Sequence, residues 1–210
     1  MACLSGAILI GGRSRRMGAN KALLPLSPEG PCIVELVARV LRTVADDIIL
    51  VGASDDRDTY DALGLCQIPD IVPAAGALGG IHAALGAARH EHTLVVGCDM
   101  PFLNPTLLHH MAALPRDYDA LIPLVGRPQP LHAIYARSAL PSIDAALAAR
   151  RYRVTGWLAQ ATVRIVPRTR ITAFDPALRS CFNMNTPDDL AFARRIAGVV
   201  TGANEDVVTP

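Results

Sequence analysis

The residues best placed for chemistry begin with the single lysine of this chain, Lys21, which closes the glycine-rich segment 9–21. Every other member of the 20 lysine and arginine residues is an arginine. A lysine ammonium is a compact, strongly hydrated point charge on a flexible stem, which suits contact with a phosphate. Biased codon use with one chance lysine is the alternative. The position of Lys21 within this segment favours the phosphate contact.

The segment 9–21 follows an apolar run, residues 7–10, that predicts a short buried strand. Its glycines therefore lie at the carboxyl end of a strand, where open α/β sheets bind their ligands. Glycine lets the backbone approach an anion, and successive N–H groups of such a turn form a concave anion site. Arg13, Arg15 and Arg16 would add positive charge above it. We therefore predict a nucleotide-binding loop.

The spacing of this loop matches neither of the two common phosphate motifs. Lys21 does not directly follow Gly18, as the lysine of a P-loop would. A dinucleotide fingerprint needs a third glycine at a set spacing and a helix that opens at once. Here Pro25 and Pro28 delay the next predicted helix to about Cys32.

A second chemical signal follows the predicted strand 93–97. Asp99 lies at the carboxyl end of this strand, and Pro101 stiffens the chain as it leaves. Such a carboxylate is well placed to hold a hard cation through oxygen while substrate phosphates complete the coordination shell. We predict Asp99 as the metal ligand; capping of the helix that starts near Asn104 is the alternative, although Asn104 can cap it itself. Cys98 is interpreted as a small core residue.

Asp70 and three glycines, Gly76, Gly79 and Gly80, form a third candidate group. A carboxylate that accepts hydrogen bonds from guanine N1–H and its exocyclic amine would discriminate against bases without that donor pair. The glycines would let the start of a helix approach the nucleotide. A polar turn between strand and helix is the alternative for Asp70.

The last candidate pair, Asn183 and Asn185, stands before Thr186 and Pro187. Thr186 is predicted to cap a helix whose first residue is Pro187. The asparagines occupy alternate positions, which predicts that both point to the same side of a strand. Amides donate and accept hydrogen bonds, which suits contact with a polar ligand. Turn formation by asparagine is the alternative.

Strands and helices are predicted to alternate from the start to the middle of the chain, the pattern of parallel βαβ units. Strands are predicted at 7–10, 47–51, 67–71, 93–97, 120–125, 131–135 and 163–166. Helices are predicted at 33–44, 57–63, 138–150, 154–161 and 188–196, with a further buried helix within 71–88. Residues 120–125 and 131–135 are expected to be antiparallel neighbours joined by a turn. We predict one domain over 1–197 and a mobile tail over 198–210.

Composition favours a cytoplasmic enzyme. A net charge of +1 and a pI of about 7.7 argue against a nonspecific nucleic-acid binder. The five cysteines are odd in number and form no CxxC pair, which indicates a reducing compartment. The apolar stretch at the N-terminus precedes its arginines, the reverse of a signal peptide. The longest uncharged run, 71–88, contains Pro73 and four glycines, so it predicts a loop and a buried helix instead of a membrane span.

Together these segments resemble the molybdenum cofactor guanylyltransferase family of nucleotidyltransferases, from Leu9 to about Ala193. The shared segments are Gly-Gly-x-Ser-x-Arg-Met-Gly-x-x-Lys, Asp70 before Gly-x-Leu-x-Gly, Cys-Asp-Met-Pro-Phe, Gln-Pro-Leu-His-Ala-Ile-Tyr and Phe-Asn-Met-Asn-Thr-Pro. The resemblance implies a Rossmann-like three-layer α/β/α sandwich with a mostly parallel sheet. It also implies transfer of GMP from GTP to molybdopterin with Mg²⁺, or Mn²⁺, and release of pyrophosphate.

The nucleotide and cofactor contacts predicted from the motifs and this resemblance are Leu9, Ile10, Gly11, Gly12, Ser14, Lys21, Gly52, Asp70, Gly79, Asp99, Asn183 and Asn185. Three residues are predicted to be catalytic: Lys21, Arg16 and Asp99. In an in-line attack on the α-phosphorus of GTP, Lys21 and one of Arg15 or Arg16 would offset charge on the leaving pyrophosphate. Asp99 would hold Mg²⁺ against the α-phosphate.

Two departures from the family pattern bear on nucleotide affinity and base choice. Asn20 stands where many members have an acid before the lysine, and Gly52 where some have an amide-bearing contact. A cytidylyl or other nucleotidyl transferase acting on a related acceptor is therefore an alternative. A non-catalytic nucleotide-binding subunit is another, against which the retention of Lys21 and Asp99 argues. Molybdenum insertion proteins or molybdoenzyme chaperones are the partners that the resemblance suggests.

Overall fold

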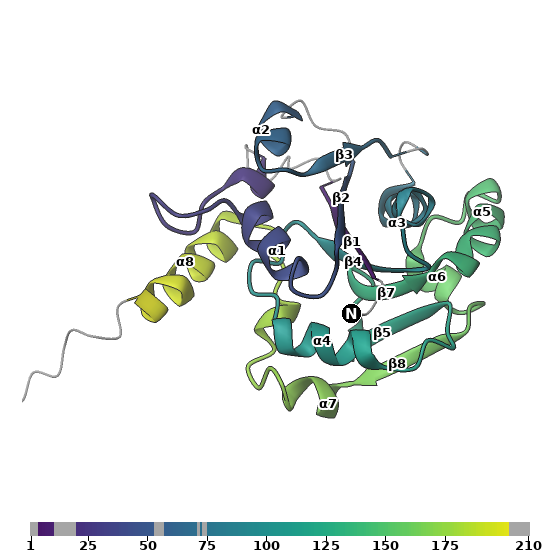
Figure 1. The fold of residues 1–210 in the computed structure, drawn as a ribbon. Coiled ribbons are helices and arrows are strands. Elements are labelled where there is room, and N and C mark those ends of the chain that lie inside the picture. The colour runs from purple at the N-terminus through teal and green to yellow at the C-terminus, as the bar shows by residue number, and fades with distance from the viewer. Residues whose placement is uncertain (1–3, 11–19, 53–56, 71, 73–74, 202–210) are drawn as a thin grey trace, which may run out of the picture.

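The computed structural model describes residues 4–10, 20–52, 57–70, 72 and 75–201. The predictions for Gly11, Gly12, Ser14 and Arg16 fall outside these ranges. The described strands are β1 (Ser5–Leu9), β2 (Asp47–Val51), β3 (Cys66–Ile68), β4 (His92–Gly97), β5 (Ala120–Val125), β6 (Arg127–Pro128), β7 (His132–Ala136) and β8 (Val163–Pro167). They join in one sheet in the order β3-β2-β1-β4-β7-β5-β6, with β8 beside β5 (Figure 1).

The half of the sheet that carries the candidate site is parallel. Strand β1 pairs in parallel with both β2 and β4, and β2 pairs in parallel with β3. Residues of β1 are buried throughout, as expected for a central strand covered on both faces. The carboxyl ends of β1, β2 and β4 therefore meet at one edge of the sheet. Strand β7 then runs antiparallel between β4 and β5, so the sheet is mixed beyond β4.

Helices cover both faces of the sheet and give the predicted three layers (Figure 1). The described α-helices are α1 (Ile33–Leu41), α2 (Arg57–Ala62), α3 (Gly76–Ala87), α4 (Pro105–Ala113), α5 (Leu140–Ala148), α6 (Val154–Leu158), α7 (Arg168–Thr172) and α8 (Pro187–Thr201). Short 3₁₀ helices are η1 (Lys21–Leu23), η2 (Arg137–Ala139) and η3 (Arg179–Cys181). One core lies beneath α1 and α4, and the other beneath α3, α5 and α6.

The predicted strands at 47–51 and 120–125 match β2 and β5, and the antiparallel pairing of β5 with β7 is confirmed. Three short helices, η1, η3 and α7, were not predicted, because so few residues carry no clear 3.6-residue pattern. The predicted turn between β5 and β7 contains the short strand β6. Helix α8 runs through Gly198 to Thr201, past the predicted end at 196, since one glycine costs a helix only about 1 kcal/mol.

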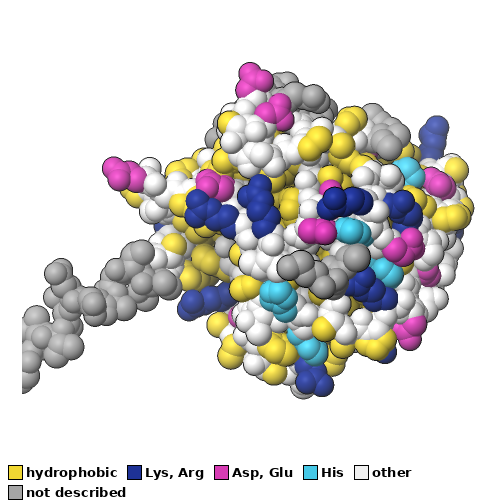
Figure 2. All heavy atoms as spheres, viewed as in Figure 1, with side chains coloured by type: hydrophobic (Ala, Val, Ile, Leu, Met, Phe, Trp, Pro, Cys, Tyr) yellow, Lys and Arg dark blue, Asp and Glu magenta, His cyan; other side chains and the backbone are white. Residues whose placement is uncertain are grey.

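Charged side chains of both signs are interspersed on the face shown in Figure 2. This distribution agrees with the net charge of +1. Across the described part of the chain, no helix combines the length and the apolarity that crossing a membrane requires.

Candidate active site

The carboxyl ends of β1 and β4 bring two predicted segments together. The register places Leu9 beside Gly97, and the Cys98 N–H donates to the Leu9 carbonyl at 3.1 Å. On the other side of β1, the Ile10 N–H donates to the Val51 carbonyl at 2.9 Å. The carboxyl ends of β1 and β4 therefore lie side by side.

Lys21 and Asp99 meet at this edge. The Lys21 Nζ donates to Asp99 Oδ2 at 2.6 Å and to the amide oxygen of Asn185 at 3.2 Å. The side chains of Lys21 and Asp99 are only 17% and 15% exposed, so their ion pair is mostly shielded from solvent. The structure thus joins three predicted site residues from three separate segments of the chain.

The carboxylate of Asp99 packs tightly against Gly97. A Cβ built on Gly97 would lie 2.5 Å from Asp99 Oδ1, closer than side-chain carbons approach a neighbour. The Asp99 carbonyl accepts from the Met184 N–H at 2.8 Å, which attaches the segment before α8 to the loop after β4. Asn104 caps α4 by accepting from the Leu107 N–H at 3.0 Å. Capping of α4 is therefore not the role of Asp99.

The start of α8 fixes Asn185. Thr186 accepts from the Asp189 N–H at 3.1 Å, and Asp189 accepts in return from the N–H groups of Asn185 and Thr186, each at 2.8 Å. This reciprocal arrangement is a capping box, and it confirms the predicted cap. The same hydrogen bonds, that from Asn185 N–H first, lower the pKa of Asp189.

The prediction that Asn183 and Asn185 lie on one strand was wrong. Residues 182–186 form no strand, because the Met184 N–H bonds to Asp99 instead of to a neighbouring strand. Asn183 donates to the Cys181 carbonyl at 3.1 Å, a local turn contact of the kind that was the alternative. Of the two asparagines, Asn185 is the one bonded to Lys21.

Asp70 lies over the first turn of α3. Its Oδ1 accepts from the Val72 N–H at 3.1 Å, which is the turn contact, and a Cβ on Gly79 would lie 2.9 Å from the same oxygen. A Cβ on Gly80 would lie 3.0 Å from the Leu9 side chain. The absence of side chains at both glycines therefore lets α3 approach Asp70 and β1. The nucleotide contacts predicted for Asp70, Gly79 and Leu9 stay predictions.

Gly52 ends β2 with a φ of +137°, a conformation open to glycine. Its carbonyl accepts from the Gln67 side-chain amide at 2.6 Å. Gly52 has no side-chain amide, but the side-chain amide of Gln67, on the neighbouring strand β3, lies against position 52. No signal in the sequence indicated this, because it depends on the pairing of β2 with β3.

The site contains a thiol that is unsuited to act as a nucleophile. Burial raises the pKa of Cys98 to about 12, and the charge of Asp99 acts in the same direction. The thiol is therefore neutral near pH 7 and packs in the core, as predicted.

The oxygen atoms around Lys21 fit a hard cation. Within the described ranges, no group of three or more His, Cys, Asp or Glu residues is arranged to hold a metal ion. Asp99 Oδ2 and Asn185 Oδ1 already converge on one cationic group, the ammonium of Lys21. A carboxylate and an amide oxygen suit Mg²⁺ when phosphate oxygens and water supply the other ligands.

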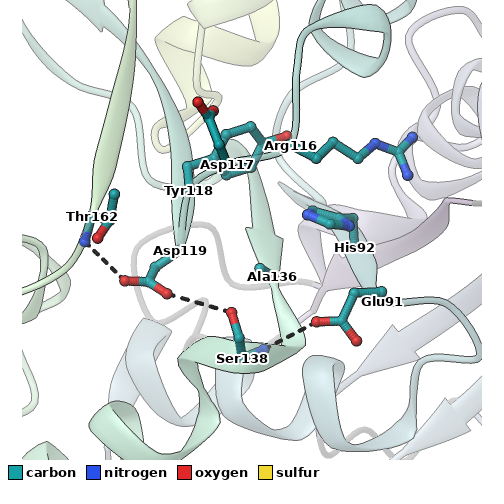
Figure 3. A pocket seen from close by; sticks show the side chains of 9 residues that line it. All are labelled: Glu91, His92, Arg116, Asp117, Tyr118, Asp119, Ala136, Ser138 and Thr162. Atoms are coloured by element: carbon teal, nitrogen blue, oxygen red, sulfur yellow. Dashed lines mark hydrogen bonds between the residues drawn. The ribbon is translucent and has the colours of Figure 1, made fainter.

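A separate hollow of about 330 Å³ lies at the opposite edge of the sheet (Figure 3). His92 begins β4 there, whereas Asp99 follows the carboxyl end of the same strand. Asp119 accepts from the Thr162 N–H at 2.8 Å and from the Ser138 hydroxyl at 3.4 Å, so this carboxylate joins loops. None of the predicted site residues lines this hollow.

The fold and the site together define a class. The three-layer α/β/α fold gathers a lysine and an aspartate where its parallel strands end, which is where open α/β sheets bind their ligands. A family model of the MobA-like NTP transferase domain matches residues 6–164, so the chain belongs to that family of nucleotidyltransferases.

Related proteins cover nearly the whole chain. It is 38% identical over 194 residues to "Probable molybdenum cofactor guanylyltransferase" of Pelotomaculum thermopropionicum, covering 92% of this chain and 93% of the relative. It is 36% identical to the protein of the same name from Chloroflexus aggregans, covering 93% and 95%. Among solved structures, molybdopterin-guanine dinucleotide biosynthesis protein A of Archaeoglobus fulgidus matches with a TM-score of 0.78 at 31% identity, over 92% of this chain and 98% of that one.

Proposed function

We propose that this chain is a molybdenum cofactor guanylyltransferase, which transfers GMP from GTP to molybdopterin and releases pyrophosphate. The relatives' names suggest the reaction, and the observation that carries it is the contact between Lys21 and Asp99 at the edge of β1 and β4. In this reaction a terminal phosphate oxygen of molybdopterin forms a bond to the α-phosphorus of GTP. The bond from that phosphorus to the bridging oxygen breaks, and its electron pair leaves with pyrophosphate.

The chain's own residues position charge for this step. The attacking phosphate is already ionised near neutral pH, so no general base is required. Lys21 neutralises charge on the departing pyrophosphate, with Arg16 as its predicted helper. Asp99 and Asn185 supply oxygen ligands for Mg²⁺, or Mn²⁺, which when bound neutralises phosphate charge and orients it for in-line attack. Lys21 itself donates to Asp99 and Asn185, so these oxygens would be open to a metal ion only if its ammonium contacted the triphosphate instead.

The remaining polar groups of the edge are assigned to the two substrates. Asp70, close to the first turn of α3, contacts the guanine or its ribose, with Gly79 leaving room. Asn183 and, through its amide nitrogen, Asn185 would contact the pterin or its phosphate from the segment that precedes α8. Ile10, Gly11, Gly12 and Ser14 belong to the phosphate loop. These assignments follow the sequence motifs and the position of each described residue at this edge.

Measuring pyrophosphate release with GTP, CTP, ATP and UTP, each with and without molybdopterin, tests the function. We expect release that needs molybdopterin and is fastest with GTP. Preference for CTP would assign the chain to the cytidylyl reaction. Pyrophosphate release that does not depend on molybdopterin would contradict the proposal that molybdopterin is the acceptor. In titration calorimetry, Asp70→Ala should narrow the preference for GTP over CTP by about 1 to 3 kcal/mol, the value of a lost charged hydrogen bond.

We propose that the protein works in the cytoplasm. The four described cysteines, Cys32, Cys66, Cys98 and Cys181, are free thiols, which suits a reducing compartment. Its product is a cofactor for other proteins, so we propose molybdenum insertion proteins or molybdoenzyme chaperones as the partners that supply or receive the cofactor. A pull-down from the native host with the tagged full chain, followed by mass spectrometry, tests this: recovery of neither class would contradict the proposal.

A further inference from the structure

Asn20 joins the catalytic lysine to the core of the protein. Its Oδ1 accepts from the Ala22 N–H at 3.1 Å, so it caps η1, the 3₁₀ helix whose first residue is Lys21. Its Nδ2 donates to the Tyr60 hydroxyl at 2.9 Å. One amide side chain thus fixes the backbone on which Lys21 stands and attaches it to a residue 40 positions away.

Tyr60 is a rigid anchor for this contact. Its side chain is fully buried in the core beneath α1. Its carbonyl accepts from the N–H groups of Leu63 and Leu65, at 3.1 and 3.0 Å, which fixes the turn between α2 and β3. A phenol held in this way has little freedom to follow a moving partner. Asn20 is therefore held by a buried residue of α2.

The chain around Lys21 is held on both sides. Ala22 is buried in the same core as Tyr60, and the Leu23 N–H donates to the Asn20 carbonyl at 3.1 Å. From this fixed backbone the Lys21 side chain extends to Asp99 and Asn185. A shift of η1 would be passed directly to the ammonium, since a residue at the start of so short a helix has few other restraints.

We infer that Asn20 and Tyr60 are positioning residues that set the location of the Lys21 ammonium. The geometry shows how an amide serves at position 20. Asn20 donates to the phenol oxygen and accepts from Ala22, whereas a carboxylate only accepts. An uncharged side chain also adds no second carboxylate to compete with Asp99 for Lys21. The importance of this position for turnover rests on the proposed function.

Lys21 is the single lysine, so it can report on its own position. Reductive methylation of the full chain with ¹³C-formaldehyde labels Lys21 and the N-terminal amine and keeps the positive charge. In the ¹H–¹³C spectrum of the otherwise unmodified protein, the Lys21 signal is identified by its loss in Lys21→Arg. This measurement needs neither GTP nor molybdopterin, so it stands even if the proposed reaction is wrong.

Four variants test the inference. Asn20→Ala and Tyr60→Phe should each move the Lys21 signal toward that of a solvent-exposed dimethyl-lysine. The double variant should move it no further than Asn20→Ala alone, because that change already removes the contact with Tyr60. Asn20→Asp should also displace the signal, since its carboxylate cannot donate to the Tyr60 oxygen and adds a second anion beside Lys21. In the unlabelled enzyme, Asn20→Ala should lower kcat by about tenfold while KM for GTP changes less, as expected for a misplaced catalytic group.

Two matched controls separate positioning from stability. Asn104→Ala removes another asparagine cap, that of α4, together with its hydrogen bond to the Phe174 carbonyl. Tyr118→Phe removes the hydroxyl of another buried tyrosine, at the far edge of the sheet. Both should leave the Lys21 signal in place, even where Asn104→Ala lowers Tm. If Asn20→Ala lowers Tm without moving the signal, or if Asn104→Ala moves it equally, Asn20 is only a structural cap and the inference is overturned.

Discussion

Gly97 lies directly beside the carboxylate of Asp99. Because Gly97 has no side chain, there is room for this carboxylate. A Cβ on Gly97 would be 2.5 Å from Asp99 Oδ1, and the next nearest atoms are the Asp99 carboxyl carbon at 3.6 Å and the Met100 side chain at 3.7 Å. The glycine is the last residue of β4, and its φ is not positive, so an alanine backbone fits there. The requirement for glycine is therefore the space for the Asp99 carboxylate.

Gly97→Ala should turn the Asp99 carboxylate away from Lys21 and lower turnover by about tenfold or more, because displacement of a catalytic group by a fraction of an ångström is costly. The fold should persist, since the three atoms nearest to the added methyl all belong to side chains, those of Asp99 and Met100. Steady-state kinetics with circular dichroism would show this.

Gly86→Ala is the control: its Cβ would meet nothing within 4 Å, so it should retain turnover and gain about 0.5 to 1 kcal/mol of stability in α3. Wild-type turnover in Gly97→Ala would contradict the inference that Gly97 leaves the space that the Asp99 carboxylate needs.

Asp99→Asn should leave the fold nearly unchanged and cut turnover by about 10²-fold, because an amide lacks the charge to hold Mg²⁺ against phosphate. Kinetics at saturating Mg²⁺, with Tm as the control for folding, would measure this. Turnover close to that of the unmodified protein would remove Asp99 from the metal site.

Local signals were enough to predict Lys21 and Asp99. Each residue follows a buried apolar strand, and the parallel alternation of strands and helices requires that such strand ends share one edge. The strand at 93–97 was predicted because its run is apolar and bounded by charge and glycine, and it matches β4.

The contacts that complete the site could not be predicted, because they join distant parts of the chain. Asn185 reaches Lys21 across 164 positions through the Met184 hydrogen bond to Asp99. Alternate asparagines look like a strand when no partner for their backbone is known, and a tertiary hydrogen bond overrode that pattern. The role of Gly97 was hidden for a related reason: a glycine at a strand end carries no sign of what its missing side chain would meet.

The burial of His132 predicts that the folded protein loses stability in acid. Burial lowers its pKa from 6.5 to about 4, and Asp175 only partly opposes this. The unfolded chain therefore binds a proton more readily than the folded one, so the free energy of unfolding should fall by about 3 kcal/mol as the pH drops from about 6.5 to below 4. Urea unfolding between pH 4 and 7.5 should show a flatter pH dependence for His132→Phe. The exposed His109→Gln should keep the wild-type slope, and an unchanged slope in His132→Phe would contradict the prediction.

Lys21 should make metal binding depend on the nucleotide. Its ammonium lies 2.6 Å from Asp99 Oδ2, so a divalent ion that approaches without GTP must displace a like charge from its ligand. With GTP present, the triphosphate draws the ammonium away and offers its own oxygens. Mn²⁺ binding followed by electron paramagnetic resonance should therefore be at least about tenfold tighter with GTP than without it, and by linkage Mn²⁺ should tighten GTP equally. Lys21→Met, which removes the charge but keeps a long side chain, should bind Mn²⁺ alone more tightly than the unmodified protein and lose most of the coupling. Asp99→Asn should bind Mn²⁺ weakly in both conditions. If Lys21→Met binds Mn²⁺ without GTP no more tightly than the unmodified protein does, the ammonium does not weaken metal binding at Asp99.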